Sequence, residues 1–140
     1  MKSIAALVGE LDSALGDFFD ADSRDVFDAL ADHPEGKSAI EPLFGFLEEN
    51  GETDLGAPGP VVHFIESFPV DAYIEPLVAS ILRAPGHYTL WMVNRILNAT
   101  PGAERRRRLL ALLGDVGARE DIDPSLCDEA LEYVMYQRSQ

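Results

Sequence analysis

The side chains that could do acid–base or metal chemistry are few and scattered. His63 and Glu66 stand three residues apart, so on a helix they would share a face as an acid–base pair or two metal ligands. An exposed, hydrogen-bonded surface pair has the same spacing. His33 and His87 belong to no HExxH or His-x-His motif, and the chain has no GxSxG elbow or P-loop. We therefore predict no enzymatic activity, no cofactor and no metal site.

Cys127 is the only cysteine, which excludes an internal disulfide and a cysteine-rich zinc site and suits a reducing cytosol. It lies on an apolar side of its expected helix, which is typical of a small core residue rather than a nucleophile.

Four consecutive arginines, Arg105 to Arg108, would suit a phosphate or nucleic-acid ligand. On a helix, however, consecutive side chains point in four directions and cannot all meet one ligand. We expect Arg105 and Arg106 to lay their stems on the core and to pair with acids of neighbouring helices. Because the chain carries a net charge of −14, we expect no nucleic-acid partner.

The residues from Pro85 to Asn98 hold the best candidates for a binding anchor. On a helix, Trp91, Asn94, Arg95 and Asn98 fall at i, i+3, i+4 and i+7 and share one face. Trp and Arg often dominate binding energy, but large aromatic residues are also usually buried. Trp91 and Arg95 therefore either contact a partner or pack within the fold, and we expect both asparagines mainly to support the scaffold.

The acidic residues are concentrated in the first half of the chain. Residues 1–80 hold 17 Asp and Glu against three Lys and Arg, a net −14, whereas residues 81–140 hold eight of each sign. Such a field repels nucleic acid and anionic membranes and speeds association with basic partners. A solvated surface that only maintains solubility is the alternative. The candidate contacts for a basic partner are Asp17, Asp20, Asp22, Asp25 and Asp28, followed by Glu48, Glu49, Glu52 and Asp54.

The elements that must position these residues are all predicted to be helices. Apolar residues recur at helical spacing, and no segment alternates with the period of two that is typical of a strand. Thr100 and Pro101 are predicted to begin the seventh helix as cap and first-turn proline, and Gly114 to end it. The expected helices span 3–15, 22–32, 38–50, 59–68, 71–83, 87–98, 100–113 and 124–138.

Two further expectations concern which side chains face the core. Phe18 and Phe19, in the connection after Gly16, are both expected to fill it. The residues of the last helix that we expect to face inward are Cys127, Ala130, Leu131, Val134 and Met135.

The chain also shows a weak internal repeat. Ile40-Glu41-Pro42-Leu43 recurs 34 residues later as Ile74-Glu75-Pro76-Leu77. A repeat of this length with two helices per unit is typical of stacked α-hairpins. We predict one all-α domain over residues 1–140, a short HEAT-like solenoid of about seven to eight helices. Its hairpins would span 22–50, 59–83 and 87–113, with residues 3–15 and 124–138 as caps.

Length and hydropathy indicate a soluble protein. One hundred and forty residues suffice for a single domain with its own core. No apolar run approaches the roughly 20 residues that a membrane span needs, and Glu10 and Asp12 interrupt any secretory signal. We expect a cytoplasmic protein that is a monomer or a weak homodimer and has no membrane partner.

Residues 58–115 resemble small all-α immunity proteins of bacterial polymorphic-toxin and contact-dependent growth inhibition systems. The resemblance rests on GPVVHFIE at 59–66, SILR at 80–83, Pro85 and above all WMVNRILN at 91–98. It implies a protein that binds a cognate toxin domain in the cytoplasm of the producing cell and blocks it. Many such toxins are basic nucleases, which would suit an acidic partner. Residues 1–57 lie outside the resemblance, as expected for a part adapted to one toxin.

Two other functions stay open. An α-solenoid adaptor would bind a basic protein or peptide in a groove along its inner helices. A hydrolase would place His63 and Glu66 in a common pocket with a metal.

Overall fold

The computed structural model describes residues 1–140 and is entirely helical, with 72% helix and no strand, which confirms the all-α prediction. The chain divides into two compact units, Met1–Leu77 and Val78–Gln140, and the division falls inside helix α7 (Val70–Arg83). We call them the N-terminal unit and the C-terminal unit and describe each by itself. None of the helices combines the length and the apolar character that a membrane span requires.

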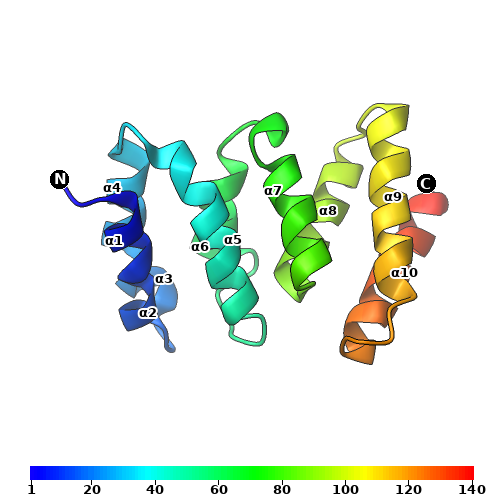
Figure 1. Ribbon diagram of the computed structural model, residues 1–140, viewed down its shortest axis with the longest axis horizontal. Coiled ribbons are helices and arrows are strands. Elements are labelled where there is room, and N and C mark those ends of the chain that lie inside the picture. The colour runs from blue at the N-terminus through cyan, green and yellow to red at the C-terminus, as the bar shows by residue number, and fades with distance from the viewer. The chain divides into compact units, whose positions relative to one another are not determined.

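The N-terminal unit buries one face of each of its main helices. Helix α6 packs against both α4 and α5, and α1 packs against α4 and α5 (Figure 1). The side chains at its centre are Leu11, Leu30, Leu43, Phe44, Leu55 and Ile65, all fully buried. The elements that precede α7 are α1 (Ile4–Gly9), α2 (Leu11–Ala14), α3 (Phe19–Asp22), α4 (Arg24–Asp32), the 3₁₀ turn η1 (Gly36–Ala39), α5 (Ile40–Glu49) and α6 (Gly59–Glu66).

The first helices differ from the prediction in their breaks. The expected helix over 3–15 is interrupted at Glu10, which separates α1 from α2. The Ser3 hydroxyl caps its start by accepting the Ala6 N–H at 3.1 Å. Gly16 follows the C-cap of α2 with φ +146°, a conformation that an L side chain rarely adopts, so the expected end of the helical segment near residue 15 is confirmed.

The internal repeat appears in the helix bounds. Helix α4 spans 24–32, and 34 residues later α6 spans 59–66. The segment 36–49, made of η1 and α5, is followed at the same offset by α7, which spans 70–83. The repeated proline falls in the first turn of α5 as Pro42 but inside α7 as Pro76. The two copies therefore have segments of nearly equal length, but in the second copy one continuous helix, α7, with an interior proline stands where the first copy has η1 and α5.

The C-terminal unit contains the end of α7 and three further helices, of which α10 packs against both α8 and α9. Their bounds are α8 (His87–Asn98), α9 (Ala103–Gly117) and α10 (Pro124–Arg138). The predicted start and end of α9 are both wrong. Gly102 precedes its first residue, Thr100 has φ +52° outside the helix, and the helix continues through Gly114. Burial of Leu113 and Val116 outweighs the cost of a glycine in the helix interior.

Helix α10 faces the core with a different stripe from the one predicted. Its buried residues follow at intervals of four and three, namely Leu126, Ala130, Val134 and Gln137. Leu131 and Met135 are 42% and 72% exposed, so their predicted inward position is wrong. Cys127 is half-buried, and its thiol donates to the Arg119 carbonyl at 3.3 Å. Because α10 has apolar residues on more than one side, its packing against α8 and α9 determines which of them are buried.

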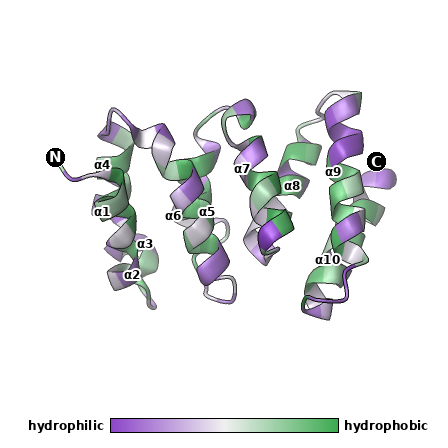
Figure 2. Ribbon diagram, in the orientation of Figure 1, coloured by the Kyte–Doolittle hydropathy of each residue, from purple (hydrophilic) through white to green (hydrophobic).

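The arginine run lies in the hydrophilic first turns of α9 (Figure 2). Arg105 and Arg106 are half-buried, as predicted, whereas Arg107 and Arg108 are exposed. Arg106 donates from Nη2 to the Gln137 carbonyl at 2.8 Å rather than to an acid. A cation suits this position because the last carbonyls of a helix lack partners within the helix.

Candidate functional site

A cavity with a volume of about 730 Å³ lies in the N-terminal unit. Its walls come from the α2–α3 connection, α4, the α5–α6 loop and α6. The carboxylates that line it are those of Asp17, Asp20 and Asp54. Its aromatic lining consists of Phe19, Phe27, Phe64 and the imidazole of His63. We call this cavity the acidic pocket.

The acidic pocket joins the two acidic segments that the sequence separates. Asp17 and Asp20 belong to the first predicted cluster, and Asp54 belongs to the second. All three side chains are exposed, so they are hydrated in the free protein and can meet a partner without a large desolvation penalty. The N-terminal unit contains the whole net charge of −14, and these carboxylates place part of that charge around a concave surface.

The α5–α6 loop holds Asp54 at the pocket by a tight local structure. Leu55 is only 1% exposed and anchors the loop in the core. The Asp54 carboxylate accepts the Gly56 N–H through Oδ1 at 3.0 Å. Gly56 has φ +109°, and a Cβ there would stand 2.4 Å from the Gly59 Cα. Only glycine fits this turn without displacing the backbone.

A cluster of phenylalanine rings supports the other side of the acidic pocket. The rings of Phe27 and Phe64 are 5.9 Å apart between centroids, and Phe64 meets Phe68 edge-on at 5.4 Å. Phe19 stacks on Phe46 at 5.9 Å. Because Phe27 is half-buried, part of its ring is left to face a ligand. The pocket therefore combines negative charge with an aromatic surface.

Phe18 is exposed at 73%, so the prediction that it fills the core is wrong, whereas that for Phe19, at 3%, is confirmed. Phe18 precedes α3 as its N-cap residue, whereas Phe19 is the first residue of the helix and is buried. Phe18 stands between Asp17 and Phe19, which both line the acidic pocket. A large exposed aromatic residue in this position is typical of a protein-binding anchor.

The other predicted acidic contacts lie outside the acidic pocket. Asp22, Asp28, Glu49 and Glu52 are exposed, and Glu48 is half-buried. Asp25 lines a second cavity of about 350 Å³, together with residues of the N-terminal segment.

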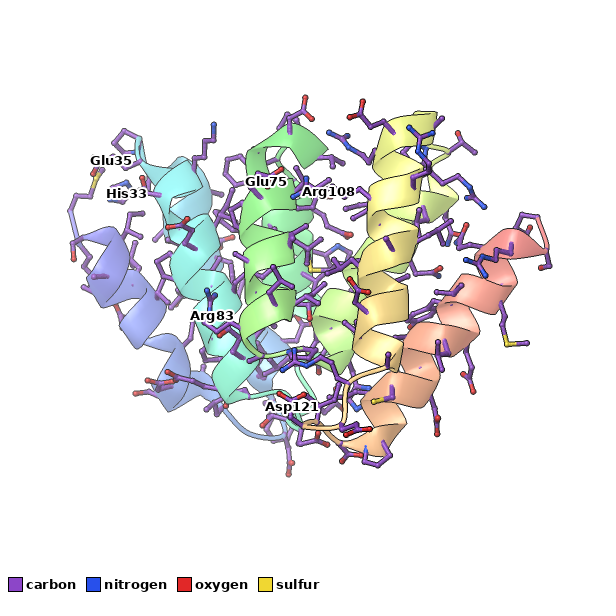
Figure 3. The ribbon with its side chains drawn as sticks, turned by 45° about the vertical axis from the view of Figure 1, so that its right-hand side comes forward. His33, Glu35, Glu75, Arg83, Arg108 and Asp121 are labelled. Atoms are coloured by element: carbon purple, nitrogen blue, oxygen red, sulfur yellow. The ribbon has the colours of Figure 1, made fainter.

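Three of the polar side chains around this second cavity, those of Lys2, Glu10 and His33, have partners within the protein. Lys2 and Glu10 form an ion pair at 2.9 Å. His33 Nδ1 accepts the Glu35 N–H at 3.0 Å, so the proton lies on Nε2, which donates to the Lys2 carbonyl at 3.1 Å. His33 and Glu35 lie together where the chain leaves α4 (Figure 3). This arrangement tethers the N-terminal segment.

The four residues of α8 that were expected to share one face lie in the C-terminal unit and form two pairs, Asn94 with Asn98 and Trp91 with Arg95. Gln137 Nε2 donates to Asn94 Oδ1 at 2.8 Å and to Asn98 Oδ1 at 2.7 Å, so the side chains of both asparagines make contacts within the fold. Trp91 is half-buried, and the exposed Arg95 places Cζ 5.7 Å from its ring. This is a cation–π contact. It leaves part of the indole at the surface.

The histidines occupy positions that their spacing does not predict. His63 is exposed at the acidic pocket, whereas Glu66 is half-buried and does not line it. No three His, Cys, Asp or Glu side chains are grouped so that they could hold a metal ion. His87 Nδ1 meets Glu129 Oε1 at 2.9 Å, a pair 42 residues apart that the sequence analysis missed. The other Glu129 oxygen is buried without a hydrogen-bond partner.

Four ionisable groups of the C-terminal unit have shifted pKa values, among them Arg119, whose pKa is raised chiefly by its hydrogen bond to Asp121. Burial, and then the charges of Glu129 and Glu132, raise the pKa of Tyr133 to about 12. The Ser125 N–H, which donates to Asp123 Oδ1 at 2.9 Å, lowers the pKa of Asp123, which is the N-cap residue of α10. Hydrogen bonding from Arg119 lowers the pKa of Asp121 in the loop between α9 and α10 (Figure 3).

The aromatic side of the acidic pocket had no sequence signal of its own, because Phe27 and Phe64 stand at ordinary core spacing in their helices.

Comparison of the chain with protein-family models, with curated proteins and with solved structures finds no match.

Proposed function

We propose that this chain binds a basic protein partner without chemistry, and that the partner is a bacterial toxin domain which it blocks by occlusion. The observation that carries the proposal is the acidic pocket, where carboxylates from both acidic segments surround an aromatic surface. A protein partner with Lys and Arg at its own surface complements both features.

The charge distribution supports a fast, steered association. The N-terminal unit carries the net −14, and the field of such a surface raises the encounter rate with a basic partner. Exposed Phe18 beside the acidic pocket offers an apolar anchor for the short-range contact that follows. Steering and anchoring are separate contributions, and the N-terminal unit has residues for both.

The identification of the partner as a toxin rests on the resemblance of residues 58–115 to immunity proteins. In this proposal WMVNRILN supports the fold, since the amides of Asn94 and Asn98 are both engaged by Gln137. Asp17, Asp20 and Phe18 lie outside the resemblance and would select one toxin. The site of action would be the cytoplasm of the producing cell.

An adaptor for a basic protein or peptide is the second candidate, because the acidic pocket would suit that partner equally. The two functions differ in the identity of the partner and in the result of binding. Only an immunity protein protects a cell from its partner.

Coexpression with the product of the neighbouring gene tests the proposal. We expect the chain to copurify with that product, to restore growth of cells that express it, and to bind it more weakly as salt is raised. Binding without protection would favour the adaptor. A neighbouring product that is not toxic and does not bind would contradict the immunity function.

A further inference from the structure

We propose that the acidic pocket receives an arginine side chain of the protein partner as its central anchor. The inference that this arginine belongs to a toxin rests on the proposed function, whereas the preference of the acidic pocket for arginine can be measured without any toxin.

The size of the acidic pocket suits a side chain together with its flanking backbone. A volume of about 730 Å³ lies within the range of roughly 300–1,000 Å³ that is typical of small-ligand sites. It is more than one side chain fills, so a turn of the partner chain would enter with the arginine.

The aromatic surface favours arginine over lysine. The guanidinium group is planar and weakly hydrated, so it stacks on rings such as Phe27 and His63 while its apolar stem contacts the phenylalanine cluster. Lysine carries a compact, strongly hydrated charge that gains less from such a surface.

The carboxylates supply the opposite charge from several directions. Asp17 and Asp20 come from the α2–α3 connection and α3, and Asp54 comes from the α5–α6 loop. A guanidinium group has five N–H donors in a fixed fork, which can meet more than one carboxylate at once. No Lys or Arg side chain lines the acidic pocket, so no permanent positive charge of the chain competes with the arginine there.

The direct test uses the peptide acetyl-Ala-Arg-Ala-amide and the ¹⁵N-labelled full chain. We expect amide shifts confined to residues 16–20, 27–31 and 54–67, which contain the lining of the acidic pocket. The matched peptide with citrulline keeps the shape of arginine without its charge and should bind about tenfold more weakly. The lysine peptide should bind about threefold more weakly. Equal binding of the citrulline or the lysine peptide, or shifts spread over the whole N-terminal unit, would overturn the proposal.

Two sets of charge-matched variants separate the acidic pocket from the general field. Asp17→Asn, Asp20→Asn and Asp54→Asn together remove the pocket carboxylates, and asparagine at 54 keeps an acceptor for the Gly56 N–H. Asp22→Asn, Asp28→Asn and Glu49→Gln remove three exposed charges outside it. We expect about a tenfold loss of arginine-peptide affinity for the first set and less than about twofold for the second. Equal losses would show that only net charge matters and would overturn the proposal.

A third variant tests the aromatic surface. Phe27→Leu keeps apolar bulk but removes the ring, and it should reduce the preference for the arginine over the lysine peptide to about one. Circular dichroism spectra identical to wild type establish that each variant is folded. An unchanged preference in folded Phe27→Leu would contradict the stacking contact.

The result is separable from that of the toxin experiment. If the chain protects cells and the pocket variants protect equally well, the arginine anchor is wrong and the immunity function stands. If the arginine peptide binds as expected and no toxin does, the anchor stands and the immunity function is wrong.

Discussion

Replacing Gln137 with leucine should destabilise the C-terminal unit by removing the donor of a buried amide network. Gln137 is 2% exposed, and its Nε2 donates to both Asn94 Oδ1 and Asn98 Oδ1. Leucine has nearly the same volume as glutamine, so the change creates no large cavity. The substitution instead removes the side-chain amide that donates hydrogen bonds to Asn94 and Asn98.

The magnitude follows from the burial of the two acceptors. Asn94 is 8% exposed, so its oxygen would be left without a donor in the interior, at about 1–3 kcal/mol of unfolding free energy. Asn98 is exposed, so water can replace its lost bond, and its contribution is about 0.5 kcal/mol. We expect a total loss of about 2 kcal/mol.

Trp91 provides the measurement, because it is the only tryptophan and lies on α8 beside Asn94. Its fluorescence during urea unfolding reports on the C-terminal unit. With a denaturant slope of about 1–3 kcal/mol per molar, the midpoint should fall by roughly 1 M.

Two controls make the explanation specific to the network. Asn98→Ala should lower the unfolding free energy by less than about 1 kcal/mol, because the lost bond is solvent-accessible. Asn94→Leu combined with Gln137→Leu should be more stable than the two single losses predict, since neither partner remains unsatisfied. Stability of Gln137→Leu within about 0.5 kcal/mol of wild type, or strictly additive losses at 94 and 137, would refute the reasoning.

Three further predictions concern backbone strain and pH. In Gly56→Ala the alanine would have to adopt φ +109°, and its Cβ would stand 2.4 Å from the Gly59 Cα. We expect the unfolding free energy, measured by urea unfolding followed by circular dichroism, to fall by about 1–3 kcal/mol and arginine-peptide binding to weaken. Unchanged stability would contradict the turn geometry. Tyr133 should ionise near pH 12 in an ultraviolet titration, with Tyr133→Phe as the reference. Because the ordinary pKa of tyrosine is about 10, the stability that Tyr133 contributes is present below pH 10 and is lost as the pH rises through 12. The pKa of Asp123 is lowered in the folded state, so its contribution is present above the ordinary value of about 4 and is lost as the pH falls below it. Asp123→Ala should therefore lower the melting temperature at neutral pH but not near pH 2, and an equal loss at both pH values would be evidence against the cap.

The periodicity of apolar residues was sufficient to predict the helices, because a helix that packs on one side must repeat its apolar residues every three or four positions. Helix ends with a local mechanism were also predictable: the expected start at residue 124 follows the cap Asp123, and the expected end at residue 15 precedes Gly16. Helix ends determined by packing were not. Helix α9 continues through Gly114 because Val116 is buried beyond it, and the residues that bury it belong to other elements.

Which side of a helix faces the core was predictable only where the apolar residues formed a single stripe. Helix α10 has apolar residues on several sides, and packing against α8 and α9 buries Val134 while it leaves Met135 exposed. The same ambiguity applied to Phe18 and Phe19, of which only Phe19 enters the core to stack on Phe46.

The sequence by itself determined the helical class, the concentration of negative charge in the first half, and the residue types that could recognise a basic partner. Each of these is a local or summed property of the chain. Only the tertiary structure decided that Asp17, Asp20 and Asp54 share a pocket while Asp22 and Asp28 do not. It also paired His87 with Glu129, and Gln137 with Asn94. The physical reason is that helical periodicity relates neighbours three or four residues apart, whereas these groups meet through the packing of helices distant in sequence.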